Sequence, residues 1–207
     1  SSGDKLSKRD NVISIESFRD KHIEPLAILS LLATIGTSNS IELKDSLQQI
    51  IDEFRIKTIS TSPGRIEIDL LNSLNKKLIQ KFDYSEIEDR LKKIDDRIDR
   101  NFWETTRGNL DIVEDIKGWG DIVFNSNPIE PVDKEFIKIA LDLMPDEPWN
   151  DETWSNWTSK IKDKTGKKGK DLFLPLREAF TGMSHGPEMK KLIQLLGRDK
   201  ILERVKI

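Results

Sequence analysis

The chain has 207 residues, of which 34% are charged and 36% hydrophobic, and its formal net charge is −3. It contains no cysteine, so disulfide bonds, thiolate zinc sites and cysteine nucleophiles are excluded. No apolar run reaches the roughly 18–20 residues that cross a membrane, and the first residues lack the apolar core of a secretory signal. We therefore expect a soluble, cytoplasmic protein that makes no contact with membranes.

Apolar residues recur at helical spacing through the first half of the chain. Pro25 stands at a favoured first-turn position, and Gly36 marks a helix end. The helix that carries Leu43 to Phe54 is expected to start at a cap near Asn39, and the next long helix at a capping box on Ser85. The helices predicted for this half cover residues 14–21, 25–35, 39–54, 69–78 and 85–102.

A turn is predicted at Pro63-Gly64. After it, Ile66 and Ile68 alternate with charged residues, which allows one short strand or extended segment before the helix that Asp69 caps. On that helix, Asn75 and the two lysines after it are expected on the polar side.

The second half of the chain also predicts short helices joined by tight connections. Asn109 is expected to cap a helix that ends at Gly118-Trp119-Gly120, and Pro175 is expected to begin another. Asp133 caps a helix that Pro145 ends, and residues 164–170 form a loop. Further helices are predicted over residues 151–163, 187–196 and 201–205. The predicted fold class is therefore mainly α.

Charge is segregated along the chain, although the net charge is small. Residues 160–170 hold six lysines and one acid, whereas residues 83–99 hold seven acids and four bases. Each run is typical of a solvated helix face, but the basic run is also what an RNA-binding surface requires.

Few residues carry a recognisable chemistry on their own. His22 and His185 stand far apart without acidic-histidine motifs, so no metal site is expected, and no glycine-rich phosphate-binding motif of the nucleotide-binding enzymes is present. Arg107, beside Gly108 in a break between helices, is placed either to bind a phosphate or a base edge or to serve as a surface arginine. Trp154 and Trp157 fit a core position better than a base-stacking platform.

Residues 5–9, Lys5-Leu6-Ser7-Lys8-Arg9, form a cationic loop that resembles the KMSKS loop of class I aminoacyl-tRNA synthetases. Further blocks, in the same order, resemble the C-terminal half of bacterial glutamyl-tRNA synthetase, in particular the α-proteobacterial type. These blocks are residues 65–80, 102–110, 147–154, 172–182 and 185–188.

The resemblance implies a mainly α fold with three parts: the KMSKS loop and the remainder of a stem-contact domain (1–81), followed by two helical anticodon-binding subdomains (82–128 and 129–207). It also implies the function of a glutamate–tRNA ligase that uses ATP, with Mg, and glutamate to charge tRNA(Glu). Lys8, assisted by Lys5, would contact the ATP phosphates and stabilise the charge that develops on them.

The resemblance further implies contacts with tRNA. Arg107 falls near an arginine that reads the anticodon in the family. The remaining candidates for tRNA contact are Lys76, Lys77, Lys167, Lys168 and Arg177, the last of which also fits a buried structural role. Two departures are visible: Arg9 replaces the final serine of the loop, and Ser73 stands where relatives often carry a large aromatic residue.

Neither a nucleotide-binding domain nor its HIGH-type motif precedes residue 5, so the chain is expected to be a monomeric C-terminal part that binds no ATP and activates no glutamate alone. Two alternatives stay open. One is a helical protein-interaction module without tRNA recognition, which predicts a contiguous apolar surface patch. The other is a synthetase of altered specificity that glutamylates tRNA(Gln).

Overall fold

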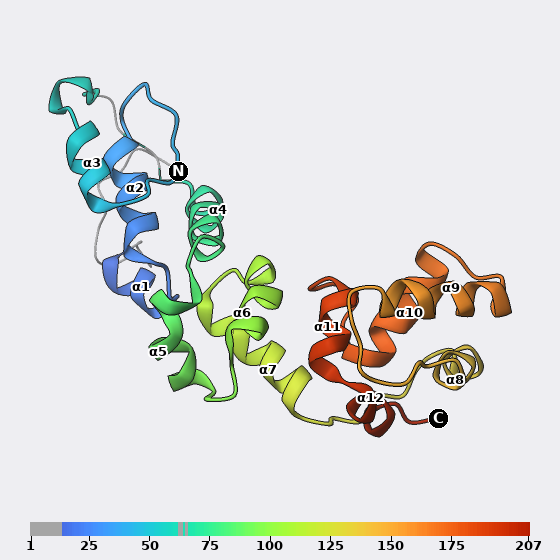
Figure 1. Cartoon of the computed structure of the whole chain (residues 1–207). Helices are drawn as coiled ribbons and strands as arrows, with labels where there is room; N and C mark the ends of the chain where they lie inside the picture. Colours follow the sequence, from blue (N-terminus) through green and yellow to red (C-terminus); the bar gives the residue numbers. More distant parts are fainter. Residues whose placement is uncertain (1–13, 62–63, 65) are drawn as a thin grey trace. The chain divides into compact units, whose positions relative to one another are not determined.

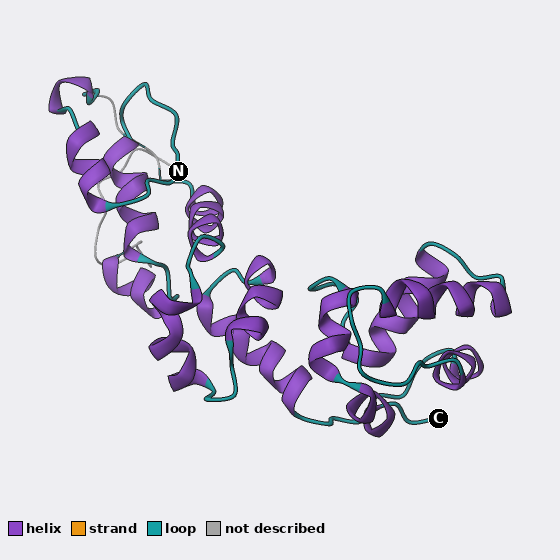
Figure 2. Ribbon diagram, in the orientation of Figure 1, coloured by secondary structure: helices purple, strands orange, loops and turns teal. Residues whose placement is uncertain are grey.

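The computed structural model describes residues 14–61, 64 and 66–207. These residues form twelve α-helices and three 3-10 helices and contain no β-strand (Figure 2). The mainly α fold predicted from the sequence is therefore confirmed. Lys5 and Lys8 lie outside the described residues. The chain divides into two compact units, and the division falls within helix α5.

Unit 1 comprises Ser1–Ile87 and Leu110–Asp115 (Figure 1). Its helices are α1 (Ile15–Asp20), α2 (Pro25–Thr34), α3 (Leu47–Glu53), η1 (Ile56–Thr58), α4 (Ile68–Ile79), η3 (Val113–Asp115) and the first turn of α5 (Tyr84–Ile94). Ser14, the first residue of the helix predicted over 14–21, caps α1 through a hydrogen bond that its side chain accepts from the Ser17 backbone N–H.

The core of unit 1 lies between α2 and α4, where Leu31, Leu71 and Leu74 are almost completely buried. Asn75, predicted on the polar side of α4, is instead fully buried. Its side-chain oxygen accepts a hydrogen bond of 2.8 Å from the Glu24 backbone N–H, and its amide nitrogen donates one of 2.8 Å to the Asp111 carbonyl. One amide side chain thus joins α2, α4 and the segment 110–115.

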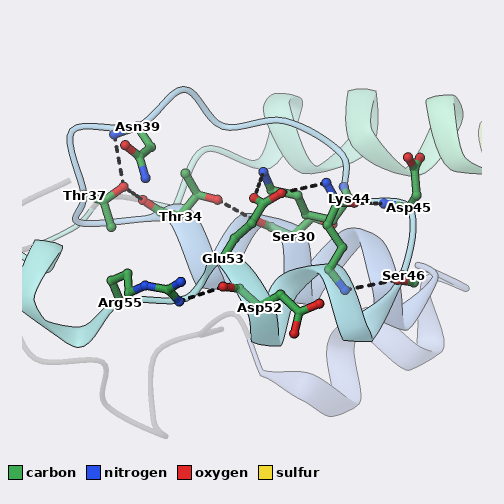
Figure 3. Close-up of polar contacts among 11 residues, drawn as sticks. Ser30, Thr34, Thr37, Asn39, Lys44, Asp45, Ser46, Asp52, Glu53 and Arg55 are labelled. Atoms are coloured by element: carbon green, nitrogen blue, oxygen red, sulfur yellow. Dashed lines mark hydrogen bonds and ion pairs between the residues drawn. The ribbon is translucent and has the colours of Figure 1, made fainter.

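The helix predicted over residues 39–54 is shorter, because residues 39–46 form a loop and Ser46 caps α3. Figure 3 shows the polar contacts that hold this loop. The Ser30 hydroxyl accepts from the Lys44 backbone N–H at 3.0 Å, and the Lys44 ammonium group donates to Glu53 at 2.6 Å. Side chains that bond the backbone outside a helix compete with helix formation, which explains the later start.

Two further predictions about regular structure in this region need correction. Residues 66–67 form no strand, although Glu67 has the extended backbone that the sequence also allows. Ile68 is already the first residue of α4, so Asp69, the expected cap, lies inside the helix. The helix predicted over 85–102 is broken: α5 ends at Ile94, and α6 begins at Arg100 after a cap at Asp99. The Asp99 carboxylate accepts from the Phe102 backbone N–H at 2.8 Å, which satisfies a donor that a continuous helix would pair internally.

The start of α5 also differs from the prediction, because Asp83 takes the capping position that was expected at Ser85. The Asp83 carboxylate accepts from the Ser85 backbone N–H at 2.9 Å, and the Asp83 N–H donates to the Glu86 carboxylate at 2.7 Å. The capping box is therefore present but begins two residues earlier.

Unit 2 comprises Glu88–Asn109 and Ile116–Ile207. It contains the rest of α5 and α6 (Arg100–Thr106), η2 (Arg107–Asn109), α7 (Ile116–Phe124), α8 (Lys134–Asp142), α9 (Thr153–Thr165), α10 (Lys170–Thr181), α11 (Met189–Leu196) and α12 (Arg198–Arg204). Asp133 caps α8, and Gly182 and Gly197 follow α10 and α11, as the sequence predicts.

Aromatic rings fill much of the core of unit 2. The rings of Trp157 and Phe180 are stacked with their centroids 5.4 Å apart, and the Trp157 indole N–H donates to the Ala140 carbonyl at 2.8 Å. Trp157 is therefore the core residue that the sequence predicts. Trp154 is only partly buried, and its ring meets Trp157 edge-on.

Helix α7 continues through Gly118-Trp119-Gly120, where the sequence predicts a helix end. Ile116, Trp119 and Val123 on its inner side are buried, and this burial outweighs a cost of about 1 kcal/mol for each helical glycine. Cations from α12 satisfy the carbonyl groups at its end. Arg204 donates to the carbonyls of Ile122 and Asn125, and Lys200 donates to that of Val123 at 2.7 Å.

Helix α10 begins at Lys170, so Pro175 lies inside it and does not begin it. Proline removes the hydrogen bond to the carbonyl of Asp171, four residues earlier. Asp171 is exposed, so water can reach the end of the helix where that carbonyl lies. The loop predicted over 164–170 is correspondingly shorter, because α9 reaches Thr165 and α10 starts at residue 170.

Candidate RNA-binding surfaces

Two of the predicted tRNA contacts, Lys76 and Lys77, occupy the last turn of α4 in unit 1. The Lys76 ammonium group forms an ion pair of 2.9 Å with the Asp111 carboxylate. Lys77 is exposed, and among the described residues it has no ion pair. Lys77 is therefore available to a phosphate, whereas Lys76 would first have to leave Asp111. Ser73 is exposed on the same helix.

Arg107 lies in unit 2, where α6 passes into the 3-10 helix η2. Its guanidinium group forms an ion pair of 2.6 Å with Glu104, and its side chain is 28% exposed. A side-chain atom added at Gly108 would meet nothing within 4 Å, so the backbone beside Arg107 is open to an approaching ligand. The role of Arg107 in reading an anticodon stays a prediction.

Lys167 and Lys168 follow α9, but only Lys168 is exposed. The Lys167 ammonium group lies 2.8 Å from the Asp133 carboxylate and 4.6 Å from the centroid of the Phe136 ring. The hydrogen bond from Lys167, together with that from the Phe136 backbone N–H, holds the pKa of Asp133 below its usual value. Lys167 thus fastens the loop to the start of α8, and Lys168 stays the more accessible candidate for a phosphate contact.

Arg177, on α10, makes the structural contact that was one of its two possible roles, and its contact with tRNA stays a prediction. Its Nη2 donates to the Pro187 carbonyl at 2.9 Å, which is a structural contact. Its Nη1 is buried and has no hydrogen-bond partner among the described residues. Burial lowers the pKa of this guanidinium, which nevertheless stays protonated near neutral pH. An unpartnered donor of this kind carries a desolvation cost that a bound acceptor would relieve.

Two adjoining hollows meet at Arg177. The first, of about 380 Å³, is lined by Trp154, Phe173, Arg177, Glu188, Met189 and Lys190. The second, of about 290 Å³, is lined by Gly169, Lys170, Phe173, Leu174, Arg177 and Ser184. We call the pair the Arg177 hollows.

The Arg177 hollows combine the three elements that bind an unpaired nucleotide. Phe173 is 45% exposed, and its ring centroid lies 6.3 Å from that of Trp154, so aromatic faces are open to a base. Arg177 supplies planar donors for a base edge or a phosphate. Lys170 and Lys190 add positive charge, although Lys190 also pairs with Glu188 at 3.2 Å.

Several residues of these hollows are absent from the sequence-based predictions. Phe173 lies within an apolar run, so the sequence does not distinguish it from its buried neighbours. The helical spacing of Trp154 predicts a core position. Lys170 belongs to the basic run 160–170, which does point toward this surface. Lys190 carried no separate signal. Helical spacing assigns a residue to a face but does not say whether another element covers that face.

The described part of the chain contains no group of three or more histidine, cysteine, aspartate or glutamate side chains that could hold a metal ion. None of its helices is both long and apolar enough to cross a membrane.

A family model described as "Anticodon binding domain" matches residues 69–207. Two curated relatives are the proteins named glutamate–tRNA ligase 1 of Bartonella quintana, 40% identical, and of Anaplasma marginale, 36% identical. Each match covers 99% of this chain but only 46% and 47% of the relative, so the chain spans less than half the length of these proteins.

Solved structures support the same fold. A glutamate tRNA ligase from Elizabethkingia meningosepticum, solved in complex with its amino acid, matches 89% of this chain and 41% of its own with a TM-score of 0.73. The glutamate–tRNA synthetase of Elizabethkingia anophelis matches with a TM-score of 0.71. Both are 16% identical, so they bear on the fold alone. Because the family model covers more than half of the chain, the chain belongs to the anticodon-binding-domain family.

Proposed function

We propose that this chain is the tRNA-binding part of a glutamate–tRNA ligase and that the Arg177 hollows receive unpaired nucleotides of the tRNA. The observation that carries the second point is the buried Nη1 of Arg177, which lacks a partner beside the exposed Phe173. Base stacking on an aromatic ring and a guanidinium donor are how proteins bind unstacked RNA bases.

The full-length ligase would join glutamate to tRNA(Glu) with ATP and Mg. In that setting Lys8, assisted by Lys5, would act on the ATP phosphates, as the resemblance implies. We also propose a cytoplasmic, monomeric protein. The three-part division at residues 81 and 128 stays a prediction.

Exposed apolar side chains in unit 1 bear on the alternative of a protein-interaction module. Leu29 and Leu32 on α2, and Leu47, Ile51 and Phe54 on and after α3, are each at least 39% exposed. The alternative predicts a contiguous apolar patch, whereas these exposures are those of single side chains, and nothing in the described part of unit 1 indicates a partner that would cover them. Membership of the anticodon-binding family favours RNA binding as the function.

The test is a binding titration with tRNA(Glu), tRNA(Gln) and a duplex RNA of similar length. We expect Arg177→Gln to weaken tRNA binding at least tenfold, since a hydrogen bond to a charged group contributes about 1.5–3 kcal/mol. Lys138→Gln is the matched control, because it removes one exposed charge from α8 outside the hollows. Equal binding of the duplex, or equal effects of the two variants, would contradict the proposal. The two tRNAs distinguish glutamate from glutamine specificity.

Salt dependence gives a second readout. If about four phosphates are neutralised, the log–log slope of affinity against salt should lie near −3 to −4. Lys168→Ala should reduce the slope by about 1, whereas Lys167→Ala should change it less because Lys167 is paired with Asp133. A flat salt response would count against RNA binding altogether.

A further inference from the structure

A second kind of hollow lies elsewhere on α10, also within unit 2. It measures about 500 Å³, and we call it the acidic groove. It is lined by Ile129, Glu130, Pro131, Val132, Asp133, Ile137, Pro175, Glu178, Ala179 and Gly182. None of these residues lines the Arg177 hollows.

Helical geometry separates the two sites. Residues 175, 178, 179 and 182 follow one another at steps of three or four or are adjacent, and they share one side of α10. Residues 170, 173, 174 and 177 share another side, more than a quarter-turn away at about 100° per residue. A ligand bound in the Arg177 hollows therefore leaves the acidic groove facing elsewhere.

The groove has an apolar floor and an apolar rim. Ile137 and Ala179 are almost completely buried beneath it. Val132 on the rim has a relative exposure of 101%, which leaves an entire β-branched side chain in water. Burying such a side chain against a partner would contribute about 1.5–3 kcal/mol.

The backbone that carries Val132 is fixed at both ends. At one end, the Ile129 N–H donates to the Arg204 carbonyl at 2.8 Å, and the Ile129 carbonyl accepts from the Lys206 N–H at 2.9 Å. At the other end, the Asp133 side chain accepts from the Phe136 N–H at 3.0 Å. Residues 130–132 thus span two anchored points, so the rim is formed before any ligand arrives and less ordering is needed on binding.

The charge of the groove is unsuited to RNA. Asp133 is paired with Lys167, but Glu130 and Glu178 form no ion pair or side-chain hydrogen bond among the described residues. Two uncompensated carboxylates beside an apolar floor repel phosphate and attract a cation. An ammonium or guanidinium group alone would leave Val132 and the floor uncovered, so the complementary ligand also carries an apolar side chain.

We propose that the acidic groove binds a segment of a partner protein in which a leucine or isoleucine is flanked by lysine or arginine. The aliphatic side chain would cover Val132 and the floor over Ile137, and the cations would pair with Glu130 and Glu178. This function is independent of RNA binding, so the whole chain would hold tRNA and a basic protein segment on different sides of α10.

The experiment titrates the isotope-labelled chain with three synthetic peptides and follows backbone amide signals. The probe is acetyl-Gly-Arg-Leu-Lys-Gly-amide, and its controls replace leucine with serine or both cations with glutamate. We expect the probe to shift signals of residues 129–133 and 175–182 with millimolar affinity and both controls to bind at least fivefold more weakly. Equal binding of all three peptides, or no shift in these residues at 5 mM probe, would overturn the proposal.

Variants test the contacts separately. Glu130→Gln combined with Glu178→Gln should weaken the probe about threefold to tenfold, since two exposed ion pairs are lost. Val132→Ser should weaken binding of the probe to a similar extent. Leu202→Ser alters an exposed apolar residue on α12, outside the groove, and should leave the affinity for the probe unchanged. All four positions are exposed or partly exposed, and thermal melting monitors folding. Shifts of residues 129–133 caused by an anticodon stem-loop RNA, or concentration-dependent self-association through the groove, would assign it to RNA or to a second copy and overturn the proposal.

Discussion

Helix α10 lines hollows on two of its sides, and these hollows differ in both charge and shape. The Arg177 hollows combine Phe173 with cations, whereas the acidic groove combines aliphatic side chains with Glu130 and Glu178. Between these faces, Leu172, Leu176 and Phe180 anchor the helix in the core of unit 2. One amphipathic helix can therefore carry two sites of opposite charge, because its exposed arc is wide enough to be divided.

The largest expected effect concerns Gly186, which precedes the residue that Arg177 contacts, Pro187. A Cβ added at Gly186 would lie 2.1 Å from the Trp119 ring, and Gly186 has a φ of 142°. Gly186→Ala should lower the free energy of unfolding by about 2–4 kcal/mol through overpacking and backbone strain. It should also disturb Pro187, whose carbonyl accepts from Arg177. Denaturant titration measures the stability.

Gly118→Ala provides the matched control for this prediction. Gly118 lies inside α7, and an added Cβ would meet nothing within 4 Å. The substitution should raise stability by about 0.4–1 kcal/mol, because alanine loses less backbone entropy in a helix. A loss of stability comparable to that of Gly186→Ala would show that the contact with Trp119 is not the cause.

The second prediction compares how a substitution in the Arg177 hollows and one in the acidic groove change the affinity for tRNA. Phe173→Ala should weaken tRNA binding by about 1–3 kcal/mol, since it removes a stacking surface. Val132→Ser, on the other face, should leave tRNA affinity unchanged. Filter binding or fluorescence anisotropy at one salt concentration measures both variants. A similar loss in the two variants would mean that RNA contacts both faces and would remove the distinction between them.

The smallest expected effect concerns Asp133, which lines the acidic groove and caps α8. Asp133→Ala should cost about 1 kcal/mol of stability, the usual contribution of a helix cap. Thermal unfolding measures the loss. Asp142→Ala, an exposed acid at the end of the same helix, should cost clearly less.

The charge of Asp133 also predicts a pH dependence. Lys167 and the Phe136 N–H lower the pKa of this carboxyl in the folded protein. Its contribution is therefore complete above the unfolded-state pKa of about 3.9 and is lost as the pH falls through the lower folded-state pKa. Asp133→Asn, which can still cap, should be less stable than the parent at pH 7, and the difference should shrink as the pH falls below about 3.9. A constant difference would exclude the ion pair as its source.

The sequence predicts the helices that carry their own end signals. Asp133 caps α8, and Gly182 follows α10, because these contacts are local. The predicted end at Gly118 fails because the burial of Trp119 is a tertiary effect. The helix start predicted near Asn39 is wrong for the same reason. The loop found before Ser46 depends on a tertiary contact, the hydrogen bond between the Lys44 backbone N–H and the Ser30 hydroxyl on α2.

The candidate site is predictable only in part. The resemblance singles out Arg177, but its unpartnered Nη1 depends on packing that no local pattern encodes. Phe173 and Trp154 look alike in sequence to the buried Trp157, and only the arrangement of α9, α10 and α11 decides which of the three rings stays open. The acidic groove has no sequence signal, because it joins the extended segment 129–133 to a helix more than forty residues later.

The buried amide of Asn75 has a consequence for how the chain can be cut. Because it binds the carbonyl of Asp111, unit 1 includes residues 110–115, which follow a stretch of unit 2 along the chain. Proteolysis at one bond near residue 87 would leave the fully buried Leu110 and Val113 on the other fragment. Exchange of unit 1 between relatives would accordingly require three joins in the gene, one on either side of residues 88–109 and one after residue 115.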